Sequence, residues 1–231
     1  MVNRFLIKTI SFFLLVTANL RFSTFASSPI LPAKETPIRV EVEVQLTSTS
    51  TSKFMIEVHP EWSPLGAERF LELMKHEEFW EALRFYRVLS GSIVQFGIAG
   101  DTDFSSHWEH NVIKDDHPAK AQSNERGYIS FASLGPDTRT TIMFINLADN
   151  SKIFDRMGYT PFGRVVEGMD NVVDQIYSGY GDAKPHGDGP NTSKIYGGGN
   201  KYLKRNFPKL SYVKSVEILD GHFEWAQEDE F

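Results

Sequence analysis

Strict alternation of apolar and polar residues marks the first strongly patterned stretch of the chain after its N-terminal region. Residues 38–46 read IRVEVEVQL, in which every second side chain is apolar, and this pattern predicts a strand with one buried face. The polar run TSTSTS at 47–52 predicts a hairpin loop, and residues 53–58 predict the returning strand. Further short apolar runs predict strands at 83–89, 93–98, 128–132, 142–147, 162–166 and 212–219.

Two segments have the apolar spacing of helices. Ser63 and Pro64 supply a cap and a first-turn proline, and apolar residues follow at positions 67, 70, 71 and 74. A second helix is predicted over Met169–Tyr177, ended by Gly179 and Gly181, whereas the glycine-rich segment 182–200 predicts a long loop. Many short strands with two helices indicate an antiparallel barrel or sandwich, and a helix on either side of the strands favours a closed, capped barrel.

Residues 1–26 have the pattern of a cleavable signal or targeting peptide. Arg4 and Lys8 precede an apolar run at 10–16, and small residues allow cleavage after Ala18 or Ala26. The run is short for a membrane span, so no stable membrane insertion is expected after cleavage. We expect the secretory pathway, ending in the endoplasmic reticulum lumen or outside the cell. The alternatives are an organelle reached by that route and a membrane anchor formed by an uncleaved leader.

The rest of the chain divides into a linker (27–36), one folded domain (37–222), expected to be a monomer, and an acidic tail (223–231). A length of 231 residues, 41% of them hydrophobic, suits a single domain with a sizeable core. The net charge is -6 and no acidic residue precedes Glu35, so the folded part is acidic, which argues against nucleic acid as a partner. The absence of cysteine excludes disulfides, cysteine catalysis and thiolate metal sites.

An arginine and a glutamine lie inside two successive apolar runs. Arg87 belongs to FYRVL and Gln95 to IVQFG, eight residues further on. Both residue types are mostly exposed in proteins, and burying an unpaired charge is costly. Two polar donors on apolar strands therefore suggest a site that hydrogen-bonds an uncharged, rigid group. The structural alternative is an ion pair for Arg87 and a strand-edge contact for Gln95.

The order of motifs after Arg87 resembles that of the cyclophilins, the cyclosporin-binding class of peptidyl-prolyl isomerases. Gln95 is followed by GYISFASLGPDT (127–138), TIMFIN (141–146), IFD (153–155) and TPFGRVVEGM (160–169). The family shows P-G-F-M-x-Q-G-G, G-x-L-S-M-A-N-x-G-P-N-T, S-Q-F-F-I, W-L-D and V-F-G-x-V-x-x-G-M, and the likeness covers about residues 38–219. It implies a mainly β fold, a closed eight-stranded antiparallel β-barrel capped by two α-helices. It also implies isomerisation of X-Pro bonds in proline-containing polypeptides, assisting folding, with no cofactor.

The resemblance assigns Arg87 and Gln95 as catalytic residues and Phe144 as the floor of the proline pocket. Further substrate-binding positions are Ile93, Ala132, Ser133, Ile142, Phe154 and Tyr159. The chain departs from the family at several of these and at neighbouring positions: Ser92 replaces a pocket phenylalanine, Ile142 a second glutamine, Ile153 a tryptophan, Tyr159 a histidine and Phe96 a glycine. A prolyl-peptide-binding module or chaperone with weak or no isomerase activity, or a scaffold for partners, is therefore the alternative.

Two further segments contain residues that could form a metal site or a glycosylation site. His107, His110, Asp115, Asp116 and His117 suggest a metal site, but a His-x-x-His pattern in a loop is a weak signal and we expect no metal. The residues Asn191-Thr192-Ser193 form an N-glycosylation sequon, usable only in the secretory pathway.

Overall fold

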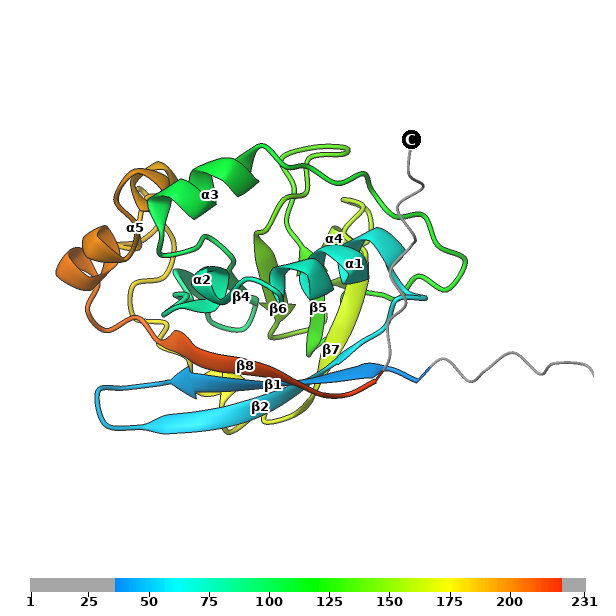
Figure 1. The fold of residues 1–231 in the computed structure, drawn as a ribbon, viewed down its shortest axis with the longest axis horizontal. Coiled ribbons are helices and arrows are strands. Elements are labelled where there is room, and N and C mark those ends of the chain that lie inside the picture. The colour runs from blue at the N-terminus through cyan, green and yellow to red at the C-terminus, as the bar shows by residue number, and fades with distance from the viewer. Residues whose placement is uncertain (1–35, 222–231) are drawn as a thin grey trace, which may run out of the picture. The chain divides into compact units, whose positions relative to one another are not determined.

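Eight strands form one antiparallel sheet in the computed structural model, which describes residues 36–221 (Figure 1). The strands are β1 (Ile38–Gln45), β2 (Thr51–Val58), β3 (Arg87–Leu89), β4 (Ile93–Phe96), β5 (Tyr128–Phe131), β6 (Met143–Asn146), β7 (Pro161–Glu167) and β8 (Tyr212–Asp220). Their order across the sheet is β3-β4-β6-β5-β7-β2-β1-β8. Each strand lies in or overlaps a segment whose pattern predicts one, so the mainly β fold is confirmed. The predicted leader and acidic tail lie outside the described residues.

The sheet curls, but its edge strands β3 and β8 meet through only a short contact. Arg84 and Tyr212 form an isolated antiparallel bridge. The N–H of Phe85 donates to the carbonyl of Ser211 at 3.1 Å, and that of Val213 to Leu83 at 2.9 Å. The chain just before β3 therefore joins β8. The barrel-like fold expected from the resemblance is confirmed, but the word closed overstates it, because the sheet is a curled half-barrel without a continuous closing ladder.

Five helices and one 3₁₀ turn accompany the sheet in the described part of the chain, rather than two capping helices. They are α1 (Pro64–Leu73), α2 (Glu77–Trp80), α3 (Thr102–Glu109), α4 (Ser151–Phe154), α5 (Thr192–Asn206) and the turn η1 (Val173–Gln175). The helix predicted over Met169–Tyr177 is wrong, since only η1 is helical there. Val172, Val173 and Ile176 are nevertheless buried, so a compact turn places in the core the same residues that gave the segment its helical spacing.

The loop predicted over residues 182–200 is also wrong in its second half, which forms α5. Asn191 caps this helix, because its side chain accepts a hydrogen bond from the N–H of Lys194 at 3.2 Å. Gly199 has φ 49° and ψ -145°, which kinks the helix. A Cβ at Gly199 would lie 2.1 Å from the carbonyl oxygen of Gly100. Glycine therefore lets α5 bend and approach the chain before α3, and Figure 1 shows the two helices side by side.

The main core fills the inner face of the sheet. Phe70 of α1 contacts Phe162 of β7 with ring centroids 5.2 Å apart, and both side chains are fully buried. A second, smaller hydrophobic cluster packs α5 against the segments next to β3 and β4; its buried members are Tyr86, Ile98, Ile195, Leu203 and Leu210. Because the core covers the inner face of the sheet, a binding site on the sheet must lie on its outer face.

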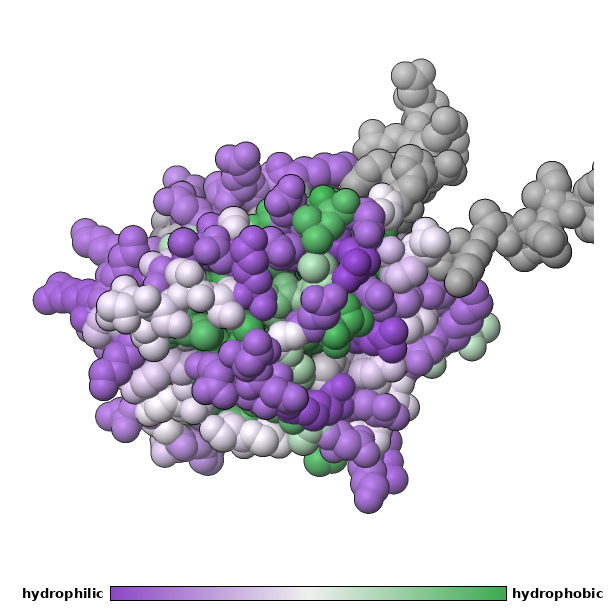
Figure 2. Space-filling model, turned by 90° about the horizontal axis from the view of Figure 1, so that it is seen from below, coloured by the Kyte–Doolittle hydropathy of each residue, from purple (hydrophilic) through white to green (hydrophobic). Residues whose placement is uncertain are grey.

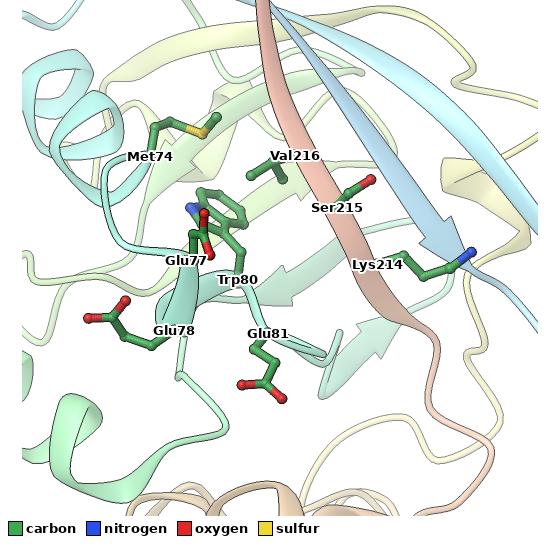
Figure 3. A pocket seen from close by; sticks show the side chains of 8 residues that line it. All are labelled: Met74, Glu77, Glu78, Trp80, Glu81, Lys214, Ser215 and Val216. Carbon is green, nitrogen blue, oxygen red and sulfur yellow. The ribbon is translucent and has the colours of Figure 1, made fainter.

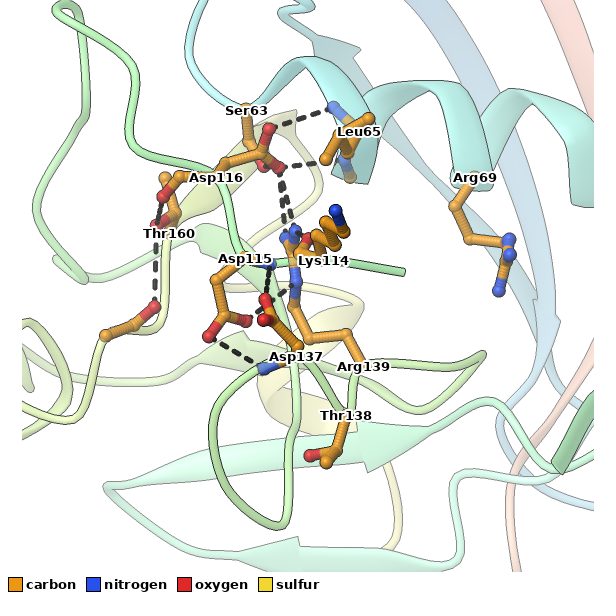
Figure 4. Close-up of polar contacts among 12 residues, drawn as sticks. Ser63, Leu65, Arg69, Lys114, Asp115, Asp116, Asp137, Thr138, Arg139 and Thr160 are labelled. Carbon is orange, nitrogen blue, oxygen red and sulfur yellow. Dashed lines mark hydrogen bonds and ion pairs between the residues drawn. The ribbon is translucent and has the colours of Figure 1, made fainter. Parts of the chain in front are cut away.

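Asp116 anchors the start of α1 from a distant loop (Figure 4). Ser63 does not cap the helix with its own side chain; its Oγ donates to Asp116 Oδ2 at 2.5 Å. The same carboxylate accepts from the N–H groups of Leu65 and Gly66, both at 3.0 Å. Both terminal nitrogens of Arg139, a side chain only 2% exposed, donate to Oδ2 at 3.1 Å. Asp116 therefore has a structural role, as helix cap and partner of a buried cation.

The outer side of β1, β2 and β8 is largely hydrophilic (Figure 2). Lys53 pairs with Glu41 at 2.5 Å, and Lys214 with Glu43 at 3.2 Å. None of the helices between residues 36 and 221 has the length and apolar composition of a membrane span.

Candidate functional site

Arg87, Gln95 and Phe144 form one row across three neighbouring strands. Arg87 of β3 pairs with Gln95 of β4, and Gln95 pairs with Phe144 of β6; the row continues to Ser130 of β5. Directly paired residues project from the same face of a sheet, and adjacent residues from opposite faces. The neighbours of the row belong to the main core: Val88, Val94, Ile145 and Ile129. The row therefore lies on the outer face of the sheet, opposite the main core.

The Arg87 guanidinium is held by two different side chains. Its Nη1 donates to Gln95 Oε1 at 3.0 Å. Its Nε and Nη2 donate to Asp182 Oδ1 and Oδ2, at 2.8 and 2.9 Å. An arginine has five N–H donors, so one N–H on each terminal nitrogen has no partner among the described residues. Arg87 remains 31% exposed, and these two donors are available to a ligand.

The ion pair also fixes the charge of both partners. The hydrogen bond to Asp182 raises the pKa of Arg87 above its ordinary value, against the opposing effect of desolvation. The hydrogen bond from Arg87 in turn lowers the pKa of Asp182. Both side chains are therefore ionised at neutral pH.

Phe144 lies beneath two further aromatic rings. Its centroid is 5.3 Å from that of Phe154 and 5.4 Å from that of Tyr159, and those two rings are 5.5 Å apart; all three contacts are edge-on. Phe144 is 2% exposed, whereas Phe154 and Tyr159 are half-buried. The structure therefore brings the predicted pocket floor together with two predicted pocket residues. Edge-to-face packing is a favoured arrangement of aromatic rings, and the three rings together form an apolar aromatic cluster.

A buried amide network fixes this aromatic cluster from the protein side. Asn124 Nδ2 donates to the carbonyl of Tyr159 at 2.7 Å and to Asp155 Oδ1 at 2.9 Å. Asn124 Oδ1 accepts from Ser130 Oγ at 2.8 Å, and Asn124 and Ser130 are fully buried. Buried polar groups of this kind must be satisfied, and the network thereby holds Tyr159 in place. No pattern in the sequence distinguishes Asn124 from an ordinary loop asparagine.

The remaining predicted binding residues are spread around the row. Ile93 is 6% exposed and pairs with Asn146, two positions along the same outer face. The N–H of Ala132 donates to the carbonyl of Ile142 at 2.9 Å, and Ser133 follows directly. The side chain of Ile142 packs against the second hydrophobic cluster. Ile153 of α4 is 62% exposed. Their roles in binding stay predictions.

A separate hollow of about 690 Å³ lies between α2 and β8 (Figure 3). The residues that line it include none of the predicted site residues; they are Met74, Glu77, Glu78, Trp80, Glu81, Lys214, Ser215 and Val216. Figure 3 shows the apolar side chains Met74, Trp80 and Val216 pointing toward one another.

Among residues 36–221, no group of three or more His, Asp or Glu side chains is placed to hold a metal ion.

Comparison with known proteins connects this chain to one family. The sequence model described as "Cyclophilin type peptidyl-prolyl cis-trans isomerase/CLD" matches residues 42–195. The chain is 32% identical over 125 residues to a peptidyl-prolyl cis-trans isomerase of Acinetobacter baylyi, across 52% of this chain and 64% of that protein. It is 31% identical over 119 residues to peptidyl-prolyl cis-trans isomerase-like 3 of Mus musculus, across 51% of this chain and 71% of that protein. The match to the bacterial protein thus spans less than two thirds of its length.

The fold is similar to that of a Cryptosporidium parvum cyclophilin type peptidyl-prolyl cis-trans isomerase. Its crystal structure superposes with a TM-score of 0.55 at 16% sequence identity, across 80% of this chain and 99% of that one. A crystal structure of the same protein in the presence of the dipeptide Ala-Pro gives a TM-score of 0.53, also at 16% identity. At this identity the likeness concerns the fold.

Proposed function

Because the chain belongs to the cyclophilin-type peptidyl-prolyl cis-trans isomerase family, we propose that it isomerises X-Pro bonds in polypeptides and so assists folding. The row formed by Arg87, Gln95 and Phe144 carries this proposal. It places a charged donor with free N–H groups and an apolar aromatic surface on adjacent strands. The Ala-Pro dipeptide used with the Cryptosporidium protein supports proline-containing peptides as the ligand class.

The chemistry follows from the electronic structure of the X-Pro amide. Rotation requires the loss of amide conjugation, with a barrier of about 18–20 kcal/mol. Phe144, with Phe154 and Tyr159, holds the proline ring, while a free N–H of Arg87 donates to the prolyl nitrogen as its lone pair localises. This hydrogen bond strengthens as the bond twists, so it stabilises the transition state more than the ground state. No bond to the substrate is made or broken, and the step needs no nucleophile or cofactor.

A prolyl-peptide-binding module with little turnover is the second candidate. The observation that favours it is the pocket position of Ser92, which has no aromatic ring. The resemblance, rather than a contact, assigns Ser92 to the pocket; its carbonyl accepts from the N–H of Leu147 at 2.8 Å and from Asn150 Nδ2 at 3.0 Å.

One experiment separates the two candidates. The full chain is mixed with a short X-Pro peptide, the cis–trans exchange rate is measured by NMR exchange spectroscopy, and the affinity is measured separately by calorimetry. An isomerase raises the exchange rate with saturable dependence on peptide concentration. Binding without acceleration would support the module, and the absence of both would contradict both candidates.

We further propose entry into the secretory pathway. The support is the leader pattern at 1–26 and the sequon at Asn191, whose residue is exposed at the start of α5. N-terminal sequencing from the native source should find a start after Ala18 or Ala26, and an intact Met1 would favour a membrane anchor instead.

A further inference from the structure

Asp182 makes the most extensive contact with Arg87, although it lies 95 residues further along the chain. We propose that Asp182 is a positioning residue for the isomerase reaction, which fixes the guanidinium of Arg87 so that its free N–H groups face the substrate. The inference rests on the proposed function. Asp182 itself is not expected to touch the substrate, and its effect is exerted through Arg87.

The pattern of hydrogen bonds defines the plane of the guanidinium. Asp182 occupies the edge formed by Nε and Nη2, and Gln95 occupies Nη1. All three nitrogens are thus held, and rotation about the last side-chain bonds is blocked. Bidentate contacts between arginine and carboxylate add geometric specificity as well as energy. Gln95 alone would fix only one of the three nitrogens.

The loop around Asp182 is built to hold its carboxylate in place. Asp182 Oδ1 also accepts from the N–H of Ala183 at 2.7 Å, and the Asp182 carbonyl accepts from Gly189 at 2.7 Å. A Cβ added to Gly187 would lie 2.3 Å from that carbonyl oxygen, and one added to Gly189 would lie 2.9 Å from it. The loop therefore closes on Asp182 at a distance that only glycine permits, and its glycine-rich composition has a specific use.

The same loop is tied to the second hydrophobic cluster. Tyr180 contacts Tyr177 and Phe207 with ring centroids 5.1 and 5.2 Å apart, and it packs against the cluster that holds α5. Pro190 is buried at the other end of the loop. A carboxylate anchored on both sides suits a fixed positioning role. If Asp182 instead competed with the substrate for Arg87, its carboxylate would have to move away before the substrate binds, and that would require a more mobile loop.

The test is Asp182→Asn in the full chain, with Asp188→Asn as matched control. Asparagine keeps the size of the side chain but loses the charge and the second acceptor oxygen. Asp188 lies in the same loop and is exposed, and its one ion-pair partner among residues 36–221 is Lys184, at 4.0 Å. We expect Asp182→Asn to lower kcat about 10-fold to 100-fold, since misplacing a catalytic group by about 1 Å costs up to about 10²-fold. Peptide affinity should change less than about threefold, because the Arg87 hydrogen bond to the prolyl nitrogen forms mainly in the transition state, and Asp188→Asn should behave as wild type.

A second measurement separates positioning from a merely structural role. In an Arg87→Ala background, Asp182→Asn should cause no further loss of rate, because the residue acts only through Arg87. If Asp182→Asn does not fold, Asp182→Glu provides the variant, and its displaced carboxylate should lower kcat while retaining the charge. An unchanged or increased rate in a folded Asp182 variant would overturn the inference, an increase indicating that the carboxylate competes with substrate. If Arg87→Ala itself leaves the rate unchanged, the proposed function fails instead.

Discussion

Replacing Asp116 by alanine should destabilise the fold more than any surface change. The carboxylate accepts hydrogen bonds from Ser63, from two N–H groups of α1 and from Arg139. Without it, the partners left to the buried guanidinium within the described part of the chain would be Asp115, at 3.4 Å, and the carbonyl of Lys114. The first turn of α1 would lose its cap at the same time.

The magnitude follows from these two losses. Removing one partner of a buried ion pair costs about 3–5 kcal/mol, and loss of a helix cap costs about 0.5–2 kcal/mol. The two share the same carboxylate and do not simply add, so we expect a loss of about 3–5 kcal/mol in the free energy of unfolding.

Urea denaturation of the full chain, followed by circular dichroism, measures this loss. Lys53→Ala is the control, because Lys53 is 56% exposed and its pair with Glu41 is screened by water; its denaturation midpoint should not shift measurably. The double variant Asp116→Ala/Arg139→Met should be more stable than Asp116→Ala, since it removes the unpaired charge. A loss below about 1 kcal/mol for Asp116→Ala would refute the account of this network.

Three further outcomes are expected. Tyr86→Phe should leave stability unchanged or raise it in thermal denaturation, because the buried hydroxyl has no hydrogen-bond partner among the described residues; a clear loss would reveal a missing partner. The stability difference between wild type and Asp182→Asn should be constant from about pH 5 to 8 and shrink below about pH 4, since Arg87 lowers the folded-state pKa of Asp182 and the stabilisation is lost as the pH falls through it; a change near neutral pH would assign the effect to another group. Cyclosporin should bind with Kd weaker than about 1 μM by calorimetry, because exposed Ile153 lacks the ring area and the N–H of the family's tryptophan; tighter binding would contradict that assignment.

The strands were the most predictable part of the fold, because alternation marks β1 as a strand with one buried face and short apolar runs mark strands such as β6, whose residues are all buried. The spacing of apolar residues was less reliable for helices. Val172, Val173 and Ile176 are buried as their spacing suggests, yet they lie in and beside a short 3₁₀ turn. The glycines at 197–199 predict a loop by composition, but the segment is helical, and one of them, Gly199, kinks the helix where it meets Gly100.

The site was predictable only where a motif carried it. Arg87, Gln95 and Phe144 stand out in the sequence, but their alignment in one row depends on the pairing of β4 with β6, which the order of strands along the chain does not reveal. The role of Asp182 could not be predicted, because the sequence does not show that this acidic residue in a glycine-rich segment contacts Arg87 in the fold. Long-range polar contacts of this kind depend on topology, and local pattern contains no information about them.

Whether Arg87 acts on the twisted X-Pro bond is decided by measuring catalysis and peptide binding separately in Arg87→Ala. Loss of one preorganised donor costs roughly 10²–10³ in kcat in other enzymes. We predict a loss in that range with peptide affinity changed far less, circular dichroism like that of wild type, and little rescue by Arg87→Lys, whose ammonium cannot reproduce the planar fork. An unchanged kcat in a folded Arg87→Ala variant, or equal losses of kcat/KM and affinity, would contradict the account.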